Sequence, residues 1–211
     1  MMTGKELVAF CESKIGTNYV YGMKGEVMTE SRYNMLKDMY GDLVWDSDRE
    51  KIGTVCVDCS GLIGWATGTF YSSSGLYSNA KKKKSIKTLI DAPAGAILYK
   101  KGHVGVYCGN EYCIEAKGSA YGVVKTKISE TAWTHWLLMD YIDYTEESTP
   151  EAESKYKSGL YEVKVNSLNR RTHPHPDAPL AGRALGKGDK LEVTEIKYKA
   201  WGYAKDRKSV V

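Results

Sequence analysis

The sequence predicts an α+β domain over residues 1–144 followed by a small all-β domain over residues 158–211. Two observations predict the first domain. Apolar residues recur at helical intervals near its start, and short alternating segments broken by glycine follow between residues 96 and 126. We therefore expect N-terminal helices packed on an antiparallel sheet. A third observation separates the domains, because residues 145–157 are acidic, contain Pro150 and lack apolar periodicity, as linkers do.

The composition is that of an ordinary protein with a folded core. Of the 211 residues, 42% are hydrophobic and 27% are charged, which suits one enzyme-sized domain and a smaller one. The net charge of +4 favours an anionic envelope but lacks the dense basic surface of a nucleic-acid binder. Sixteen tyrosines against two phenylalanines suit sugar and peptide surfaces, because tyrosine joins an apolar ring to a polar tip. We expect no nucleic-acid partner.

The chain contains no run of eighteen or more apolar residues, so we expect no membrane insertion. Residues 1–6 lack the charged-then-apolar pattern of a secretion signal. We therefore expect either a protein that stays in the cytoplasm until it is released or a secreted protein whose signal has been removed.

The first predicted element is a helix over about residues 4–15. Thr3 and Glu6 have the spacing of a capping box, and apolar residues follow at helical intervals until Gly16. A turn is predicted next, over residues 19–22.

Residues 23–54 contain a second predicted helix over residues 30–40, where apolar side chains again recur at helical spacing. This helix either shapes a substrate groove, acts as a lid or only packs on the surface, and the sequence leaves the three open. The charged residues 46–51 predict a solvated surface loop rather than a site.

A short helix is predicted directly after Asp58, with Cys59 at its N-terminus. Asp58 is a typical N-cap residue, and Ser60 lies in the first turn, where it contacts either a substrate or the unpaired N–H groups. Gly61 allows a strand or ligand to approach the helix closely. Three apolar residues bury the helix: Leu62, Ile63 and Trp65.

The remaining elements of the first domain are a loop and a sheet. Residues 68–78 are rich in Gly, Ser and Tyr, and we expect a loop with Lys81–Lys84 as its basic tip. The aromatic residues within 131–144 are expected to close the core. Strands are predicted over 96–99, 103–108, 111–116 and 122–126.

Cys59 and His103 form a candidate nucleophile and base. A free thiol is mostly protonated near neutral pH, whereas a helix N-terminus favours the thiolate. An adjacent imidazole takes the proton and later returns it to the leaving amine. A hairpin turning at residues 109–110 brings His103 beside Glu115, whose carboxylate can hold the imidazole N–H. We therefore predict covalent amide hydrolysis.

Three segments resemble the signature blocks of the NlpC-type cell-wall peptidases, which are papain-like cysteine enzymes that cut the peptide stems of bacterial peptidoglycan. The segments are GTNYVYG at 16–22, DCSGL at 58–62 and GHVGVYCGN at 102–110. The resemblance implies a papain-like fold for residues 1–144. Residues 23–54 are longer than the family usually has at this place.

The resemblance also implies roles for individual residues. Cys59 would be the nucleophile and His103 the base, with Glu115 as the third catalytic residue at a position where the family often has His. Tyr19 and the backbone N–H of Cys59 would stabilise the oxyanion. Asp58 would bind an amine of the substrate peptide, with Ser60 beside it.

The expected function is that of a cell-wall hydrolase whose partner is peptidoglycan and whose target is the bond after D-glutamate. An N-acetylmuramoyl-L-alanine amidase with the same three catalytic residues is the nearest alternative, and a non-catalytic wall-binding protein is a second. Wall hydrolases without a secretion signal are typical of phage lysins, so an endolysin is the favoured context.

The five cysteines are an odd set, so at least one stays outside any intramolecular disulfide. A structural zinc site is the competing use of Cys56, Cys59, Cys108 and Cys113. Its weakness is the odd spacing of Cys108 and Cys113, which turns their side chains to opposite faces of a regular hairpin. We expect no metal and no other cofactor, with Cys11 and both of those cysteines serving as small hydrophobic residues.

Residues 158–211 resemble the bacterial SH3-like wall-binding domain. The similar segments are 159–163, 168–171, 186–193 and 201–204, including a Gly-Lys-Gly turn and a Trp-Gly-Tyr strand. The pattern stops before the last strand that the family normally has. We therefore expect a domain that binds the cell wall, in which either the chain is truncated or the barrel is incomplete.

Overall fold

The computed structural model of the chain describes five stretches, residues 1–145, 159–171, 180–197, 201–204 and 209–210. By its internal contacts the chain divides into two units, Met1–Glu147 and Ser148–Val211. Most of the predicted linker, residues 146–157, lies outside the described residues. No helix within the described stretches is long and apolar enough to cross a membrane.

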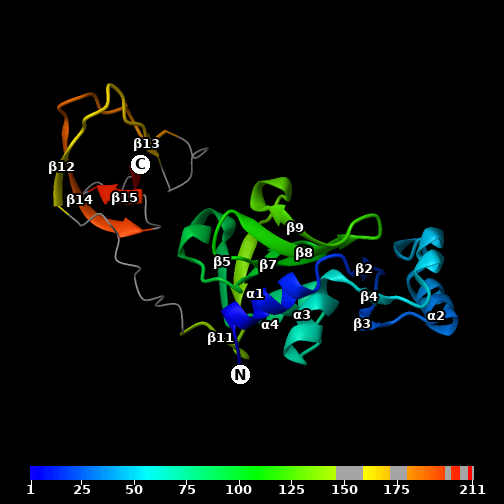
Figure 1. Ribbon diagram of the computed structural model, residues 1–211. Coiled ribbons are helices and arrows are strands. Elements are labelled where there is room, and N and C mark those ends of the chain that lie inside the picture. Colours follow the sequence, from blue (N-terminus) through cyan, green and yellow to red (C-terminus); the bar gives the residue numbers. More distant parts are fainter. Residues whose placement is uncertain (146–158, 172–179, 198–200, 205–208, 211) are drawn as a thin grey trace. The chain divides into compact units, whose positions relative to one another are not determined.

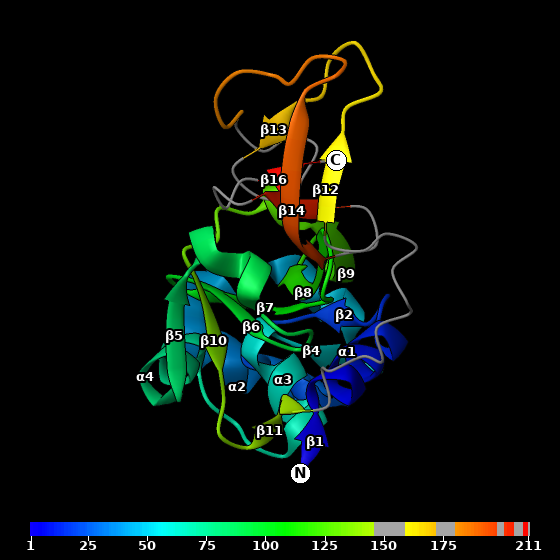
Figure 2. The ribbon, with the colours of Figure 1, turned by 90° about the vertical axis from the view of Figure 1, so that its left-hand side faces the viewer.

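A six-stranded antiparallel sheet lies at the centre of the first unit, in the order β5-β10-β6-β7-β8-β9 (Figures 1 and 2). The helices α1 (Gly4–Ser13) and α3 (Cys59–Thr67) pack against each other and on one face of this sheet. The predicted α+β class is thus confirmed for this unit. The strands are β5 (Lys82–Ser85), β6 (Ile97–Lys100), β7 (His103–Tyr107), β8 (Tyr112–Gly118), β9 (Gly122–Lys127) and β10 (His135–Leu138).

A second, smaller sheet lies at the end of the unit where α2 (Glu30–Tyr40) is found (Figure 1). Its order is β2-β4-β3, with β2 parallel and β3 antiparallel to β4. The strands are β2 (Asn18–Tyr19), β3 (Lys24–Val27) and β4 (Val55–Val57), and a further parallel pair joins β1 (Met2–Thr3) to β11 (Ile142–Asp143). The helix predicted over residues 30–40 is confirmed as α2, with Thr29 as its N-cap.

Three core clusters hold the first unit together. The largest fills the space between the two helices and the sheet, a second joins α2 to the small sheet, and a third covers the other face of the large sheet. All five cysteines are free. Cys59, Cys56 and Cys113 belong to the first, second and third cluster respectively, so these three thiols are built into different parts of the core.

The start of the chain forms the predicted helix, but the helix is shorter than expected. The capping box is present, because the Glu6 N–H donates to Thr3 Oγ1 and the Thr3 N–H donates to Glu6 Oε2. The helix ends at Ser13 rather than near Ile15. Gly16 instead bonds to β9, with its N–H donating to the carbonyl of Val123 at 2.9 Å, so pairing with the sheet replaces a further helical turn.

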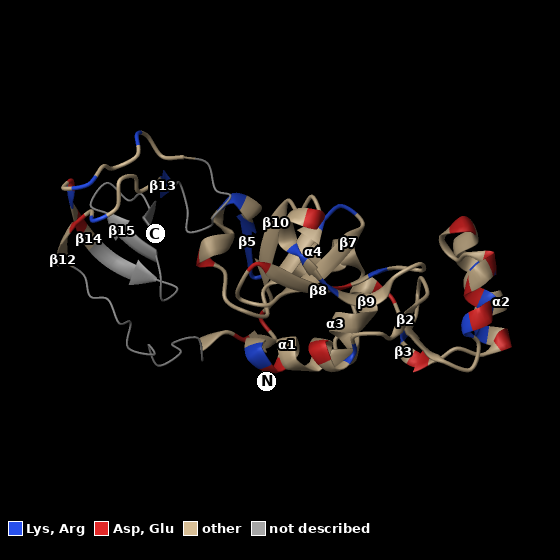
Figure 3. Cartoon of the chain, turned by 45° about the horizontal axis from the view of Figure 1, so that its top comes forward, with Lys and Arg blue, Asp and Glu red and all other residues tan. Residues whose placement is uncertain are grey.

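The region between α3 and the sheet differs from the prediction. The predicted loop contains α4 (Ser73–Asn79), capped by Ser72, and buries Leu76. The lysine run is not a loop tip, because Lys82–Ser85 form β5 and pair with β10. Lysines on an exposed edge strand discourage pairing with other chains, and this edge appears as a blue stripe in Figure 3.

The hairpin that the sequence predicted at residues 109–110 is confirmed. β7 pairs with β8 so that Val106 lies opposite Ile114 and Tyr107 opposite Cys113. Gly109 adopts a φ of 84°, a left-handed conformation that glycine enters without strain. This register carries His103 and Glu115 onto neighbouring strands.

Gly61 is required where α3 passes the chain leading into β3. A Cβ at this position would lie 2.3 Å from the carbonyl oxygen of Met23, which also accepts the Asp58 N–H. We expect Gly61→Ala to lower the free energy of unfolding by about 2–3 kcal/mol, because backbone atoms on both sides must shift. Urea unfolding of the variant measures this loss.

Gly64→Ala is the matched control on the same helix. Its added Cβ would meet the ring of Phe70, a half-exposed side chain that can turn away, and alanine favours a helix over glycine by about 1 kcal/mol. A loss in Gly64→Ala as large as that in Gly61→Ala would contradict the role given to the Met23 contact.

The described residues of the second unit form a five-stranded antiparallel sheet in the order β12-β14-β15-β16-β13. The Gly-Lys-Gly segment makes the expected turn, since the Asp189 N–H donates to the Gly186 carbonyl at 3.0 Å. Among the described residues, the C-terminal strand β16 pairs with both β13 and β15. The strands are β12 (Gly159–Glu162), β13 (Arg170–Arg171), β14 (Lys190–Lys197), β15 (Trp201–Ala204) and β16 (Ser209–Val210).

Candidate active site

Asp58 caps α3 and thereby places Cys59 at the first helical position. Asp58 Oδ1 accepts the Gly61 N–H at 2.6 Å and the Ser60 hydroxyl at 3.1 Å, while Oδ2 accepts the Gly22 N–H at 2.9 Å. The predicted cap is confirmed. Ser60 uses its hydroxyl on this cap, which joins the helix to the turn after β2.

The thiol of Cys59 is buried beside the start of β7. The helix that begins at Cys59 packs on β7, and Cys59 shares a core cluster with Val104, the residue after His103. Burial, together with the charge of Asp58, raises the pKa of Cys59 to about 12, against the effect of nearby backbone N–H groups. The helix N-terminus therefore does not ionise the resting thiol, contrary to the sequence-based expectation.

His103 and Glu115 are in direct contact, as the hairpin predicted. His103 Nε2 lies 2.6 Å from Glu115 Oε2, and Glu115 is only 1% exposed. The hydroxyls of Thr126 and Thr131 lie 2.6 Å and 3.4 Å from Glu115 Oε1, which accepts both. Because Glu115 occupies Nε2, Nδ1 is the ring nitrogen that Glu115 leaves uncontacted.

The carboxyl group of Glu115 is held in its charged form. Burial alone raises its pKa, but the hydrogen bonds from His103 and Thr126 outweigh burial and keep the pKa below its ordinary value. Since a lowered pKa keeps the group ionised at neutral and mildly acidic pH, Glu115 acts as an acceptor that fixes the tautomer of His103.

Trp133 holds the imidazole from one face. Its ring stacks on that of His103 with centroids 5.4 Å apart and planes at 14°. Gly105 makes room for this arrangement, because a Cβ there would lie 3.1 Å from the Trp133 ring. Trp133 is a core residue, as expected, and its ring also orients the imidazole of the candidate base.

Tyr19 lies on β2, almost fully buried. Burial, followed by the neighbouring Cys59 and Asp58, raises the pKa of its hydroxyl. The raised pKa keeps the hydroxyl protonated near neutral pH, so that it can donate a hydrogen bond.

Comparison with known families gives a match over most of the first unit. The model of the NlpC/P60 family matches residues 16–141, which is more than half of the chain. The chain belongs to the NlpC/P60 family. No curated protein sequence matches it.

Three solved structures are similar to this NlpC/P60 domain. The peptidoglycan hydrolase RipB from Mycobacterium tuberculosis is 25% identical with a TM-score of 0.46, and the match covers 67% of this chain and 65% of that one. The P60 domain of the antigen MAP1204 from M. avium subspecies paratuberculosis is 20% identical, with a TM-score of 0.45 and coverages of 67% and 96%. The NlpC/p60 domain of the peptidoglycan hydrolase SagA is 21% identical, with a TM-score of 0.44 and coverages of 65% and 100%.

A groove of about 570 Å³ opens beside His103 in the NlpC/P60 domain. This volume is within the range of sites for small ligands. Its lining comes from the segment before residues 46–51, from the turn between β6 and β7, and from the turn between β8 and β9. The lining includes Tyr19, Trp45, Lys100, Lys101, His103 and Tyr121.

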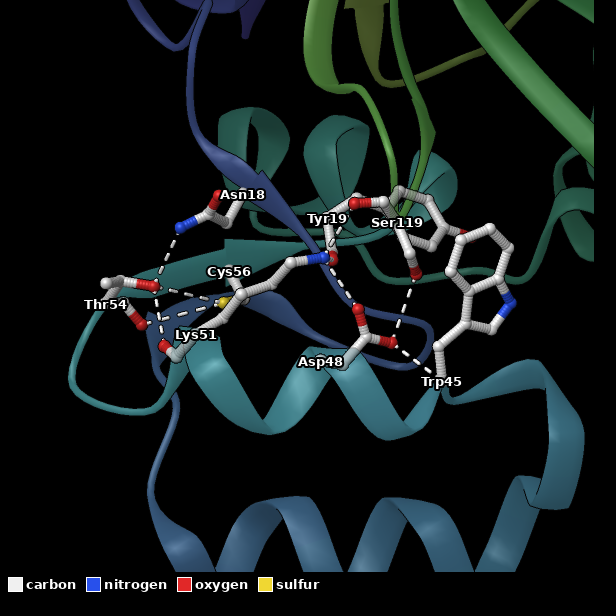
Figure 4. A network of polar contacts seen from close by, with 8 residues as sticks. All are labelled: Asn18, Tyr19, Trp45, Asp48, Lys51, Thr54, Cys56 and Ser119. Atoms are coloured by element: carbon white, nitrogen blue, oxygen red, sulfur yellow. Dashed lines mark hydrogen bonds and ion pairs between the residues drawn. The ribbon is translucent and has the colours of Figure 1, made fainter.

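The charged segment 46–51 is not the solvated loop that the sequence predicted. It forms the 3₁₀-helix η2 (Asp46–Lys51), in which Asp48 is fully buried and paired with Lys51 at 2.6 Å (Figure 4). Lys51 Nζ also donates to the carbonyls of Tyr19 and Ser119, each at 2.8 Å. Asp48 and Lys51 are thus paired with each other and hydrogen-bonded to distant segments, which the local sequence does not indicate.

Four residues that surround the site were not predicted from the sequence as site residues: Thr126, Trp133, Asp48 and Lys51. Thr126 could have been predicted from strand alternation. Glu115 pairs with Val124, and Thr126 follows two residues later on the same face. Nothing local marks Trp133 as a neighbour of His103, nor Asp48 and Lys51 as buried.

The raised pKa of Cys59 predicts how this NlpC/P60 protein reacts with iodoacetamide. Below its pKa, a thiol gains about tenfold in thiolate for each unit of pH. We expect alkylation of Cys59, measured by peptide mass spectrometry, to keep rising from pH 7 to pH 10 in the folded protein. In urea the same peptide should level off near the ordinary pKa of 9.0. A plateau at neutral pH in the folded protein would show a preformed thiolate instead.

Proposed function

We propose that the protein is a cell-wall hydrolase that cleaves an amide bond in the stem peptide of peptidoglycan by a Cys–His–Glu mechanism. The observation that carries the proposal is the 2.6 Å contact between His103 Nε2 and the buried carboxylate of Glu115. These two residues lie on β7 and β8, against which the helix that begins at Cys59 packs. The substrate is inferred from relatives, since RipB and SagA are named peptidoglycan hydrolases.

The reaction begins when the Cys59 sulfur attacks the carbonyl carbon of the amide and its proton passes to His103 Nδ1. The Tyr19 hydroxyl and the Cys59 backbone N–H stabilise the negative oxygen that forms. His103 then gives its proton to the leaving amine as the C–N bond breaks, which leaves a thioester on Cys59. Water attacks the thioester, gives a proton to His103, and releases the acid product as the thiol is restored. Glu115 stabilises the imidazolium in both halves.

The bond after D-glutamate is the proposed target, and charge supports it. Lys100 and Lys101 line the groove beside His103, and neither has an ion-pair partner among the residues that the structure describes. A lysine pair suits the α-carboxylate that D-glutamate carries next to its γ-linked amide. Asp58 Oδ2 accepts the Gly22 N–H, and the same carboxylate is the proposed acceptor for a substrate ammonium group.

The second unit is proposed to be an SH3-like wall-binding domain. Such a module would raise the local concentration of substrate at the catalytic unit without adding a contact there.

Digestion of purified murein followed by mass spectrometry of the fragments tests the proposed bond. The expected result is fragments with a new amine on the diamino acid and with D-glutamate at the new carboxyl end. Release of stem peptides that begin with L-alanine would identify an amidase instead. Unchanged murein with retained binding would favour a non-catalytic wall-binding protein.

A further inference from the structure

A buried ion pair ties three segments together at one side of the groove. Asp48 Oδ2 accepts the Trp45 N–H at 2.9 Å and the Ser119 hydroxyl at 3.1 Å, while its Oδ1 pairs with Lys51 (Figure 4). Lys51 in turn binds the carbonyls of Tyr19 and Ser119. The segment before η2, strand β2 and the turn between β8 and β9 are therefore held in one arrangement.

Such a pair does little for stability, because removing two charges from water costs about as much as their attraction returns. Its effect is to fix the positions of the backbone segments that it binds. The backbone of Trp45 is bound to the buried carboxylate, and Ser119, which lies two residues before Tyr121, is bound twice.

The aromatic side chains on this backbone are half or more exposed, and Lys117 Nζ lies 5.4 Å from the centre of the Tyr121 ring. Trp45 is 50% exposed and Tyr121 is 64% exposed, and both line the groove, as does the half-exposed Leu43. Folding thus leaves a rigid aromatic wall unburied beside the candidate active site. Large exposed aromatic residues on a fixed backbone are typical of binding surfaces, because little conformational entropy is lost when they engage a ligand.

We propose that Trp45 and Tyr121 form a subsite for a pyranose ring of the glycan, so that the enzyme acts on stem peptides still attached to sugar. This inference rests on the proposed function. The stem peptide offers small side chains and charged ends, which need no aromatic wall, whereas a pyranose presents a broad face of C–H groups that packs on an indole or phenol ring. Asp42 and Glu130 also line the groove and offer acceptors for sugar hydroxyls.

The test compares two substrates with the same stem peptide, one free and one attached to the N-acetylglucosaminyl-N-acetylmuramoyl disaccharide. We expect the wild type to have a kcat/KM about tenfold higher for the disaccharide-bearing substrate. Trp45→Ala should reduce this preference to within about twofold, chiefly by raising KM for that substrate. Met39→Ala is the matched control, since Met39 is 62% exposed on α2 but lies outside the groove lining, and its preference should match the wild type.

Equal rates on the two substrates in the wild type, or an unchanged preference in Trp45→Ala, would overturn the subsite. Calorimetric titration of Cys59→Ala protein with the disaccharide alone separates this inference from the proposed function. Binding that Trp45→Ala abolishes supports the subsite even if neither substrate is cleaved. An absence of disaccharide binding together with normal cleavage of free peptide refutes the subsite and leaves the hydrolase intact.

Discussion

Cys59→Ala is expected to lower peptidoglycan hydrolysis by at least about 10⁴-fold, because the variant keeps the groove but cannot form the thioester. The fold should survive the change, since alanine is smaller and Asp58 still caps α3. Release of new amines from purified murein measures the loss, and a murein pull-down measures binding. We expect binding to stay within about twofold of the wild type.

Cys108→Ala is the matched control for thiol chemistry. Cys108 is partly exposed and packs at the edge of the main core cluster, away from the residues of the groove lining. The variant should keep wild-type activity. Hydrolysis that survives in Cys59→Ala but disappears in Cys108→Ala would move the nucleophile to the other cysteine and overturn the mechanism.

Glu115→Gln is expected to lower kcat by about 10³-fold, although glutamine has nearly the same shape as glutamate. Thr126 and Thr131 donate to Oε1, so the amide oxygen takes that place and the amide NH₂ faces His103 Nε2. A donor at Nε2 forces the ring proton onto Nδ1, the nitrogen that must accept the proton of the thiol. The imidazolium also loses its neighbouring negative charge.

The measurement for Glu115 is the split between kcat and KM, with murein affinity as a separate readout. Glu115→Ala should lower kcat to a similar extent and also cost stability, because it leaves His103 and the two threonine hydroxyls without a partner. Thr126→Val is the graded control, expected to lower kcat by about tenfold while Glu115 keeps its bond to His103. Equal losses of kcat and wall affinity in Glu115→Gln would count against the orienting role.

Local patterns predicted those contacts of the site that form within one helix or one hairpin. Asp58 caps the helix that follows it, and a turn at Gly109 determines which strand residues become neighbours of His103. Glu115 was predictable for that reason, because the register of a tight hairpin follows from its turn. The six-stranded order of the sheet was not, since β5 and β10 pair across about fifty residues.

The predictions that were wrong concern which charged and ionisable groups are buried. A run of charges such as residues 46–51 is usually solvated, and only the packing of η2 against β2 and the turn after β8 removes Asp48 from water. The same holds for Cys59, where the helix N-terminus predicts a thiolate but the surrounding core raises the pKa. Both depend on which atoms from distant segments exclude solvent.

Taken alone, the sequence determined the α+β class of the first unit, the cap that places Cys59 and the pairing of His103 with Glu115, because each depends on neighbours within a few residues or across one turn. Tertiary structure alone decided the charge state of the thiol, the stacking of Trp133 on the imidazole, and the buried pair that holds Trp45 and Tyr19 at the groove. Those features depend on desolvation and on contacts between remote segments, and no local pattern encodes either.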